Sequence, residues 1–121
     1  MPAYNFKGQF ADAVESGRKP HTIRPRRKRP TRVGDTLYLY TGMRTKKCRL
    51  LRTATCRKVT PIAIYTSGCS GLVKLNGREM PHRELHRLAI ADGFFGIPEF
   101  LDFFADNYGP NFEGELIEWR N

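Results

Sequence analysis

The chain has 121 residues, of which 40% are hydrophobic, so it is long enough for one domain with a core of its own. Its formal net charge is +9, and 16 of its 21 Lys and Arg residues fall among residues 1–60. A field of this kind attracts phosphate polymers. The longest apolar run, residues 93–104, contains a proline and two carboxylates and is too short to span a membrane.

The cysteines indicate the compartment. Cys48, Cys56 and Cys69 are an odd number without paired spacing, and no signal peptide opens the chain. Reduced thiols in the cytoplasm are the expected state. We therefore interpret residues 1–121 as one cytoplasmic domain without a membrane partner.

The first predicted element is a helix over residues 6–16, because apolar residues recur there on one helical face: Phe6, Phe10, Ala13 and Val14. Gly17 suits the left-handed residue that ends a helix. Residues 21–24 predict a short strand in which Thr22 and Arg24 point the same way. Residues 25–32 contain two prolines and five cations and predict an exposed loop.

The middle of the chain predicts strands. After a turn at residues 34–35, Leu37 and Leu39 should share one face of a strand, with Tyr38 and Tyr40 on the other. Residues 48–65 predict one or two further strands, with Pro61 at an edge or a bend. Two glycine-containing turns follow, of which residues 76–77 form the Asn-Gly hairpin signal.

The last third predicts two helices and a closing strand. The helices cover residues 81–94 and 97–109, with these apolar residues inward: Leu85, Leu88, Ala89, Phe100, Phe103 and Phe104. Residues 112–120 alternate as a strand does. The order of helix, strands, helices and strand indicates an α+β fold whose small antiparallel or mixed sheet would curl into a barrel.

The combined pattern resembles the ASCH domain. The segments that carry the resemblance run in order over about residues 6–119: "SGRKPHTIR", "VGDTLYLYTG", "CRLL", "TATCRKVTPI", "ADGF", "EFLDFFADNYG" and "GELIEW". The densest part is G-x-K-x-x-T-I-R, followed by G-D and a hydrophobic strand. The resemblance implies a PUA-like fold, which is a small β-barrel with helices packed at its openings and a cleft beside the first helix.

The resemblance also implies functions. PUA relatives bind RNA, often at a modified base or a structured segment, and some single-domain ASCH proteins are hydrolases. One group is similar to amidohydrolases of N-acetylated cytidine, and another has ribonuclease activity. By position, Lys19 and Thr22 match the catalytic pair of the amidohydrolase-like members. Asp92 matches their acidic group, although a shift of one residue would place Gly93 there instead.

The chemistry of these residues is consistent with such a site. A threonine hydroxyl needs a neighbouring base to become a nucleophile, and burial or nearby cations lower the pKa of a lysine toward that role. Arg18 and Arg24 lie near Lys19 in sequence, and Arg24 would hold an oxyanion or a phosphate. In the alternative reading, Thr22 is only a strand residue, and Lys19 and Arg24 bind only backbone phosphate.

Further cations and aromatic residues predict contacts outside this segment. Arg26 and Arg27 would either bind phosphates or form a solvated surface. Five loop cations acting together would make binding steeply dependent on salt. Tyr40 followed by Arg44 suits single-stranded nucleic acid, where bases stack and phosphates pair, although a strand tyrosine more often packs against its neighbours.

The histidines give weak signals. His82 and His86 have the i, i+4 spacing of helical metal ligands, but Arg83 stands where the HExxH motif needs glutamate. We therefore predict no metal and no cofactor. His21 should point away from the Thr22 hydroxyl, as strand neighbours do, and is a poor base for it.

We therefore predict an RNA- or nucleotide-binding ASCH-type module with a basic cleft around Lys19, Thr22 and Arg24. Its partner would be nucleic acid, with RNA expected before DNA, or a modified nucleoside. Two alternatives stay open. One is a hydrolase on the same site, acting on an N-acylated nucleoside or on RNA. The other is a domain that docks onto nucleic acid or an acidic partner by charge alone. The sequence leaves the oligomeric state open.

Overall fold

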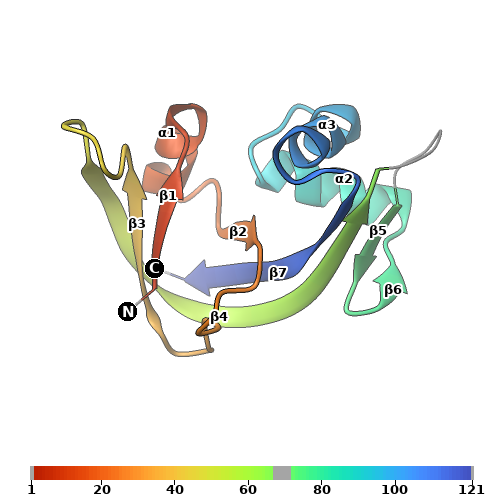
Figure 1. Ribbon diagram of the computed structural model, residues 1–121, viewed down its shortest axis with the longest axis horizontal. Coiled ribbons are helices and arrows are strands. Elements are labelled where there is room, and N and C mark those ends of the chain that lie inside the picture. The colour runs from red at the N-terminus through yellow and green to blue at the C-terminus, as the bar shows by residue number, and fades with distance from the viewer. Residues whose placement is uncertain (1, 67–71, 121) are drawn as a thin grey trace.

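The structure is a computed structural model that describes residues 2–66 and 72–120. Within these residues the chain forms one sheet of seven strands and three helices, which confirms the predicted α+β class (Figure 1). The sheet is strongly curved, and the helices lie on its concave side. The pairings of the described strands do not close it into a barrel. The cysteine Cys69 and the turn expected around it lie outside the described residues.

Strand β4 (Arg49–Tyr65) lies in the middle of the strand order and is one continuous strand of 17 residues. Its first part pairs with β3 (Thr36–Thr41), and β3 pairs in parallel with β1 (Ala3–Phe6). Leu37 and Leu39 of β3 are fully buried, as their alternation predicts. Pro61 lies where pairing with β3 has ended and pairing with the next strand has not begun, so it meets only one partner strand.

The second neighbour of β4 is the closing strand β7 (Asn111–Arg120), which in turn pairs with β2 (His21–Arg24). At the other end, β5 (Leu72–Leu75) and β6 (Arg78–Glu79) form the predicted hairpin. Its turn residues Asn76 and Gly77 have φ angles of 53° and 82°, which is the conformation that the Asn-Gly pair favours.

The prediction of a helix from residue 6 was wrong at its start, because Phe6 ends strand β1 and helix α1 covers Gly8–Ser16. Tyr4 and Phe6 are both buried at alternate positions of β1. This strand pairs with β3, more than thirty residues further along the chain. Tertiary pairing thus overrides the local helical spacing of Phe6.

The helices meet around aromatic side chains. Helix α2 (His82–Ala91) and helix α3 (Ile97–Tyr108) follow the hairpin, and their predicted inward residues are buried except Phe103, which is partly buried against the core. The Phe10 ring of α1 contacts the edges of Phe94 and Phe103, with ring centroids 5.4 and 5.8 Å apart. Edge-to-face packing of this kind fixes α1 against α3. None of the described helices has the length and apolar character that crossing a bilayer requires.

Candidate functional site

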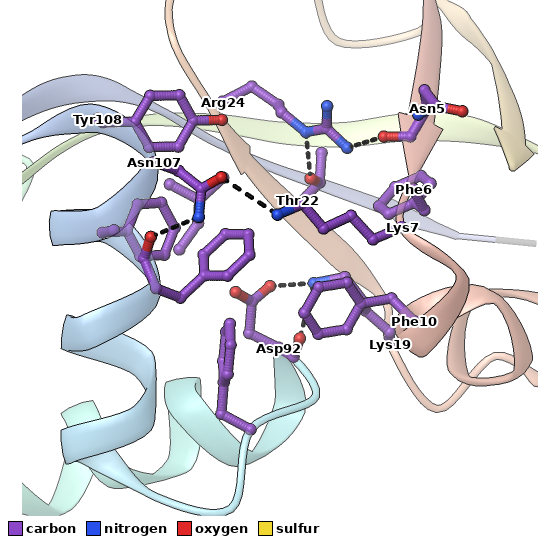
Figure 2. A pocket seen from close by; sticks show the side chains of 14 residues that line it. Asn5, Phe6, Lys7, Phe10, Lys19, Thr22, Arg24, Asp92, Asn107 and Tyr108 are labelled. Atoms are coloured by element: carbon purple, nitrogen blue, oxygen red, sulfur yellow. Dashed lines mark hydrogen bonds and ion pairs between the residues drawn. The ribbon is translucent and has the colours of Figure 1, made fainter. Parts of the chain in front are cut away.

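A pocket of about 190 Å³ lies between α1, α3 and the residues that follow α2, with strand β2 at its base (Figure 2). The four residues at the centre of the sequence-based prediction all line it: Lys19, Thr22, Arg24 and Asp92. Aromatic rings form much of the remaining wall: Phe6, Phe10, Phe94, Phe103, Phe104 and Tyr108. The pocket therefore combines ionised groups with apolar surface, which is the usual make-up of small-molecule sites.

Lys19 and Asp92 form a buried ion pair at the lower side of the pocket in Figure 2. Lys19 lies just beyond α1, which Gly17 ends with a φ of 86°, and Asp92 caps the end of α2. Both residues are only 4% exposed. The Lys19 ammonium donates to an Asp92 carboxylate oxygen and also, at 2.9 Å, to the Asp92 main-chain carbonyl.

His21 completes this buried group. Its Nε2 lies 3.2 Å from the Asp92 carboxylate oxygen that also contacts Lys19, and its side chain is buried. His21 is not among the residues that line the pocket. This placement agrees with the expectation that His21 points away from Thr22 and assigns it instead to the support of Asp92.

Burial and pairing shift the pKa values of this group. Burial lowers the pKa of the Lys19 ammonium below its usual value, the Asp92 carboxylate opposes that shift, and the nearby Arg24 adds to it. For Asp92, burial alone would raise the pKa. The charge of Lys19, the close contact with His21 and the Lys19 hydrogen bond outweigh burial, so its pKa lies below the usual value. Asp92 is therefore ionised at neutral pH.

Thr22 and Arg24 point to the same side of β2, as predicted. The Arg24 Nε donates to the Thr22 hydroxyl at 3.0 Å, and another guanidinium nitrogen donates to the main-chain carbonyl of Asn5 on β1. The same guanidinium lies over the Phe6 ring, 4.9 Å from its centroid. Burial lowers the pKa of Arg24, but an arginine stays charged at any physiological pH.

The predicted catalytic pair is brought to one pocket without direct contact. Among the described residues, no hydrogen bond joins Lys19 to Thr22. Lys19 is bound to Asp92, and the Thr22 hydroxyl accepts from Arg24. Of the two residues considered for the acidic position, Asp92 lines the pocket, whereas Gly93 adopts a φ of 101° beside Phe10.

The remaining predicted residues lie outside the pocket. Arg18, Arg26 and Arg27 are exposed, the first after α1 and the others after β2. Tyr40 is half-buried on the face of β3 opposite the buried Leu39. A shift in the strand register separates Leu39 from Tyr40, and Tyr40 is not among the residues that line the pocket. Arg44 is exposed in the turn after β3, with a φ of 67°.

Sequence reasoning missed four polar residues of the pocket: Asn5, Lys7, Asn107 and Tyr108. The Lys7 ammonium donates to the Asn107 side-chain carbonyl at 3.2 Å, across the pocket from the start of α1 to the end of α3. Figure 2 shows the Tyr108 hydroxyl directed toward Arg24. The "DNY" that follows the apolar face of α3 was the available signal, but contacts 100 residues apart leave no local periodicity.

No cluster of three or more metal-binding side chains occurs within residues 2–66 and 72–120. The thiols Cys48 and Cys56 are free. In comparisons with known proteins, no family model, no curated protein and no solved structure matches this chain. The resemblance to ASCH domains therefore stays a prediction.

Proposed function

We propose that this chain is a nucleotide-binding module of the ASCH type, and that its pocket holds one base of a nucleic acid or a modified nucleoside. The observation that supports this proposal most directly is that Lys7, Lys19 and Arg24 line one pocket with aromatic walls. Aromatic faces suit the planar surface of a base, and cations suit the phosphates beside it. The curved sheet with helices on its concave side supports a PUA-like fold as the finer description.

The charges of the pocket support an anionic or strongly polar ligand. Asp92 neutralises Lys19, whereas the partners of Lys7 and Arg24 among the described residues are uncharged carbonyl and hydroxyl groups. Within the described residues neither side chain forms an ion pair with a carboxylate, so their positive charge has no direct counter-ion there. A phosphate or the carbonyl oxygens of a base would compensate it.

The size of the pocket limits the ligand to one ring system. Pockets for drug-sized ligands measure roughly 300–1,000 Å³, whereas this one measures about 190 Å³. One base with part of its sugar is a suitable occupant. A duplex, in which bases are stacked and paired, would have to release a base first.

Calorimetric titration with cytidine, acetylcytidine and nucleoside monophosphates tests this function. Arg24→Ala should weaken binding of the preferred compound by about 10- to 150-fold, because a hydrogen bond to a charged group contributes about 1.5–3 kcal/mol. Arg83→Ala, which removes an exposed cation of α2 outside the pocket, should leave affinity unchanged. Equal losses in both variants would mean docking by charge alone and would refute a pocket function.

A second candidate function, hydrolysis of an N-acylated nucleoside, rests on a separate observation. The Thr22 hydroxyl, the Lys19 ammonium and the Asp92 carboxylate line the same pocket, and burial lowers the pKa of Lys19. In this reaction Thr22 Oγ1 would attack the acyl carbon while Lys19, once deprotonated, takes its proton. The carbon–nitrogen bond would break as Lys19 returns that proton to the leaving amine. Water would then release the acid from the Thr22 ester.

Product analysis separates the two functions. Wild type, Thr22→Ala and Thr22→Ser would each be incubated with acetylcytidine and, separately, with labelled single-stranded RNA. Acetate released by the wild type and by Thr22→Ser, but not by Thr22→Ala, would identify a threonine-dependent hydrolase. Binding without any product would leave the binding function alone, and RNA cleavage that persists in Thr22→Ala would assign turnover to Lys19 and Arg24 as charge stabilisers.

A further inference from the structure

The exposed cations that follow β2 continue directly from the pocket. A shallow hollow of about 350 Å³ lies beside the pocket, and both are lined by Asn5 and Arg24. A wider hollow of about 810 Å³ follows and shares Arg27 with the first. The three depressions thus form one path from the pocket to the loop of residues 25–30. We call its exposed part, together with the half-buried Arg24 that joins it to the pocket, the cation track: Arg24, Arg26, Arg27, Lys28 and Arg29.

Specific contacts hold the track against strand β1. The guanidinium groups of Arg24 and Arg27 both lie over the Tyr4 ring, 5.6 and 5.2 Å from its centroid. The Tyr4 hydroxyl shares a hydrogen bond with Thr31, and Arg27 donates to the Ala3 carbonyl at 3.2 Å. These contacts attach Arg24, Arg27 and Thr31 to strand β1 and so hold the loop beside the pocket.

The track gathers five positively charged side chains. None of its five cations pairs with a carboxylate within the part of the chain that the structure describes. Asp35 is the acidic residue that lines the outer hollow, and its carboxylate accepts from the main-chain N–H of Arg32 at 2.9 Å. Five neighbouring cations repel one another unless an anionic partner compensates them.

The composition of the track points to phosphates as that partner. Tyr4 is only 4% exposed, so it positions the arginines and offers no free face to a stacked base. Cations and prolines make up most of the lining of both hollows, and the buried Tyr4 is their only aromatic lining residue among the described residues. Groups of this kind follow the backbone of a nucleic acid, whereas the aromatic walls of the pocket suit a base.

We propose that the cation track binds successive phosphates of a single-stranded nucleic acid whose neighbouring base occupies the pocket. This inference rests on the proposed function and narrows its ligand class. The preferred ligand is an oligonucleotide of several residues, and a free nucleoside or mononucleotide fills only the pocket end of the path. The strand is single because a base in the pocket is unstacked from its neighbours.

The test compares two triple variants of equal charge. The track variant is Arg26→Gln with Lys28→Gln and Arg29→Gln, which spares the two arginines on Tyr4. The control is Lys46→Gln with Lys47→Gln and Arg83→Gln, three exposed cations outside the path. Fluorescence anisotropy at several salt concentrations would measure binding of a six-nucleotide RNA, the same DNA sequence and a labelled mononucleotide.

We expect the six-nucleotide strand to bind the wild type more tightly than the mononucleotide does. The track variant should bind the strand no more tightly than it binds the mononucleotide. The slope of the logarithm of affinity against the logarithm of salt concentration should fall in magnitude by about 0.7 for each phosphate contact removed. Mononucleotide binding should be the same in all three proteins. Equal losses in track and control variants would overturn the track, as would a strand that binds no better than a mononucleotide.

The two levels of the proposal fail separately. Suppose that the mononucleotide does not bind, while the strand binds the wild type and loses affinity for the track variant. The track is then supported and the proposed pocket function is refuted. If the mononucleotide binds and depends on Arg24 but gains nothing from added nucleotides, the pocket stands and the track falls. Equal affinity for RNA and DNA would support a track that reads phosphates alone, and a preference for RNA would add a contact to the 2′-hydroxyl.

Discussion

Lys19 and Arg27 belong to the same basic run but have opposite surroundings. Lys19 is 4% exposed and bound to a carboxylate, whereas Arg27 is exposed on the face of Tyr4 and donates to a main-chain carbonyl. A buried charge is costly unless it is paired, so Lys19 and Asp92 depend on each other for stability. An exposed cation costs little and acts over distance, screened by salt. The comparison separates cations that maintain the site from cations that attract a ligand to it.

Breaking the buried pair should have the largest effect on stability. Asp92→Ala leaves the Lys19 ammonium buried without its counter-charge, and we expect the free energy of unfolding to fall by about 3–5 kcal/mol. The matched control is Glu15→Ala, which breaks the half-exposed pair with Arg49 (2.7 Å) and should cost about 0–1 kcal/mol. Urea denaturation measures both. Similar costs for the two variants would contradict the contrast drawn between buried and exposed cations.

A smaller loss of stability is expected from a substitution in β7 next to the Arg24 main chain. A Cβ at Gly114 of β7 would collide with the Arg24 carbonyl and, at 2.6 Å, with the Phe112 ring. Gly114→Ala should therefore displace β2 and cost about 1–3 kcal/mol, with weaker ligand binding. Gly8→Ala is the control, because its added methyl group would meet open space at the start of α1. A Gly114→Ala protein with wild-type stability and affinity would show that neither property depends on the position of β2.

At acid pH the buried pair of Lys19 and Asp92 should contribute less to the free energy of unfolding. Because the pKa of Asp92 is lower in the folded chain than in the unfolded one, its stabilising effect is complete above its usual pKa of 3.8. That effect is lost as the pH falls from there through the folded value. The difference in unfolding free energy between wild type and Asp92→Asn should therefore narrow below pH 4. Urea titrations at a series of pH values would show it, and a constant difference would mean that Asp92 does not titrate as proposed.

The smallest expected change concerns a single exposed cation. Arg29→Ala should leave the free energy of unfolding within about 0.5 kcal/mol of the wild type. Its strand-binding affinity should nevertheless depend less on salt, with a slope lower by about 0.7. The two measurements on one variant sharpen the contrast with Asp92→Ala, whose main effect is on stability. A destabilised Arg29→Ala would assign the loop a structural role.

Local patterns predicted the elements whose contacts are local. The hairpin at Asn76, the inward face of α2 and the strand that carries Thr22 follow from backbone preferences and from spacing of two or 3.6 residues. Strand β1 was missed because its pairing partner lies more than thirty residues away and Phe6 also fits a helical spacing. The open edge of the sheet could not be predicted either, because closure depends on the pairing of distant strands.

The candidate site shows the same division. Lys19, Thr22 and Arg24 are close in sequence, so a short motif placed them correctly in one pocket. Asp92 was predicted as a site residue from the family resemblance, because no sequence pattern around it indicates this role. Lys7 and Asn107 come from the missed strand end and from the far end of α3. Lys7 carries no sequence signal that distinguishes it from an exposed lysine, and the "DNY" around Asn107 gives no hint of a partner 100 residues away.

The hydrogen bond between Lys7 and Asn107 lowers the apparent affinity of the pocket. It joins the two helices across the pocket, so an arriving ligand must compete with a donor–acceptor pair that the protein already satisfies. A hydrogen bond of this kind contributes about 0.5–1.5 kcal/mol, which leaves roughly a tenth to a third of the molecules open at any moment. The apparent affinity is reduced by that open fraction. Occupancy of the pocket thus begins from a minority conformation, and a ligand that satisfies both Lys7 and Asn107 recovers the difference.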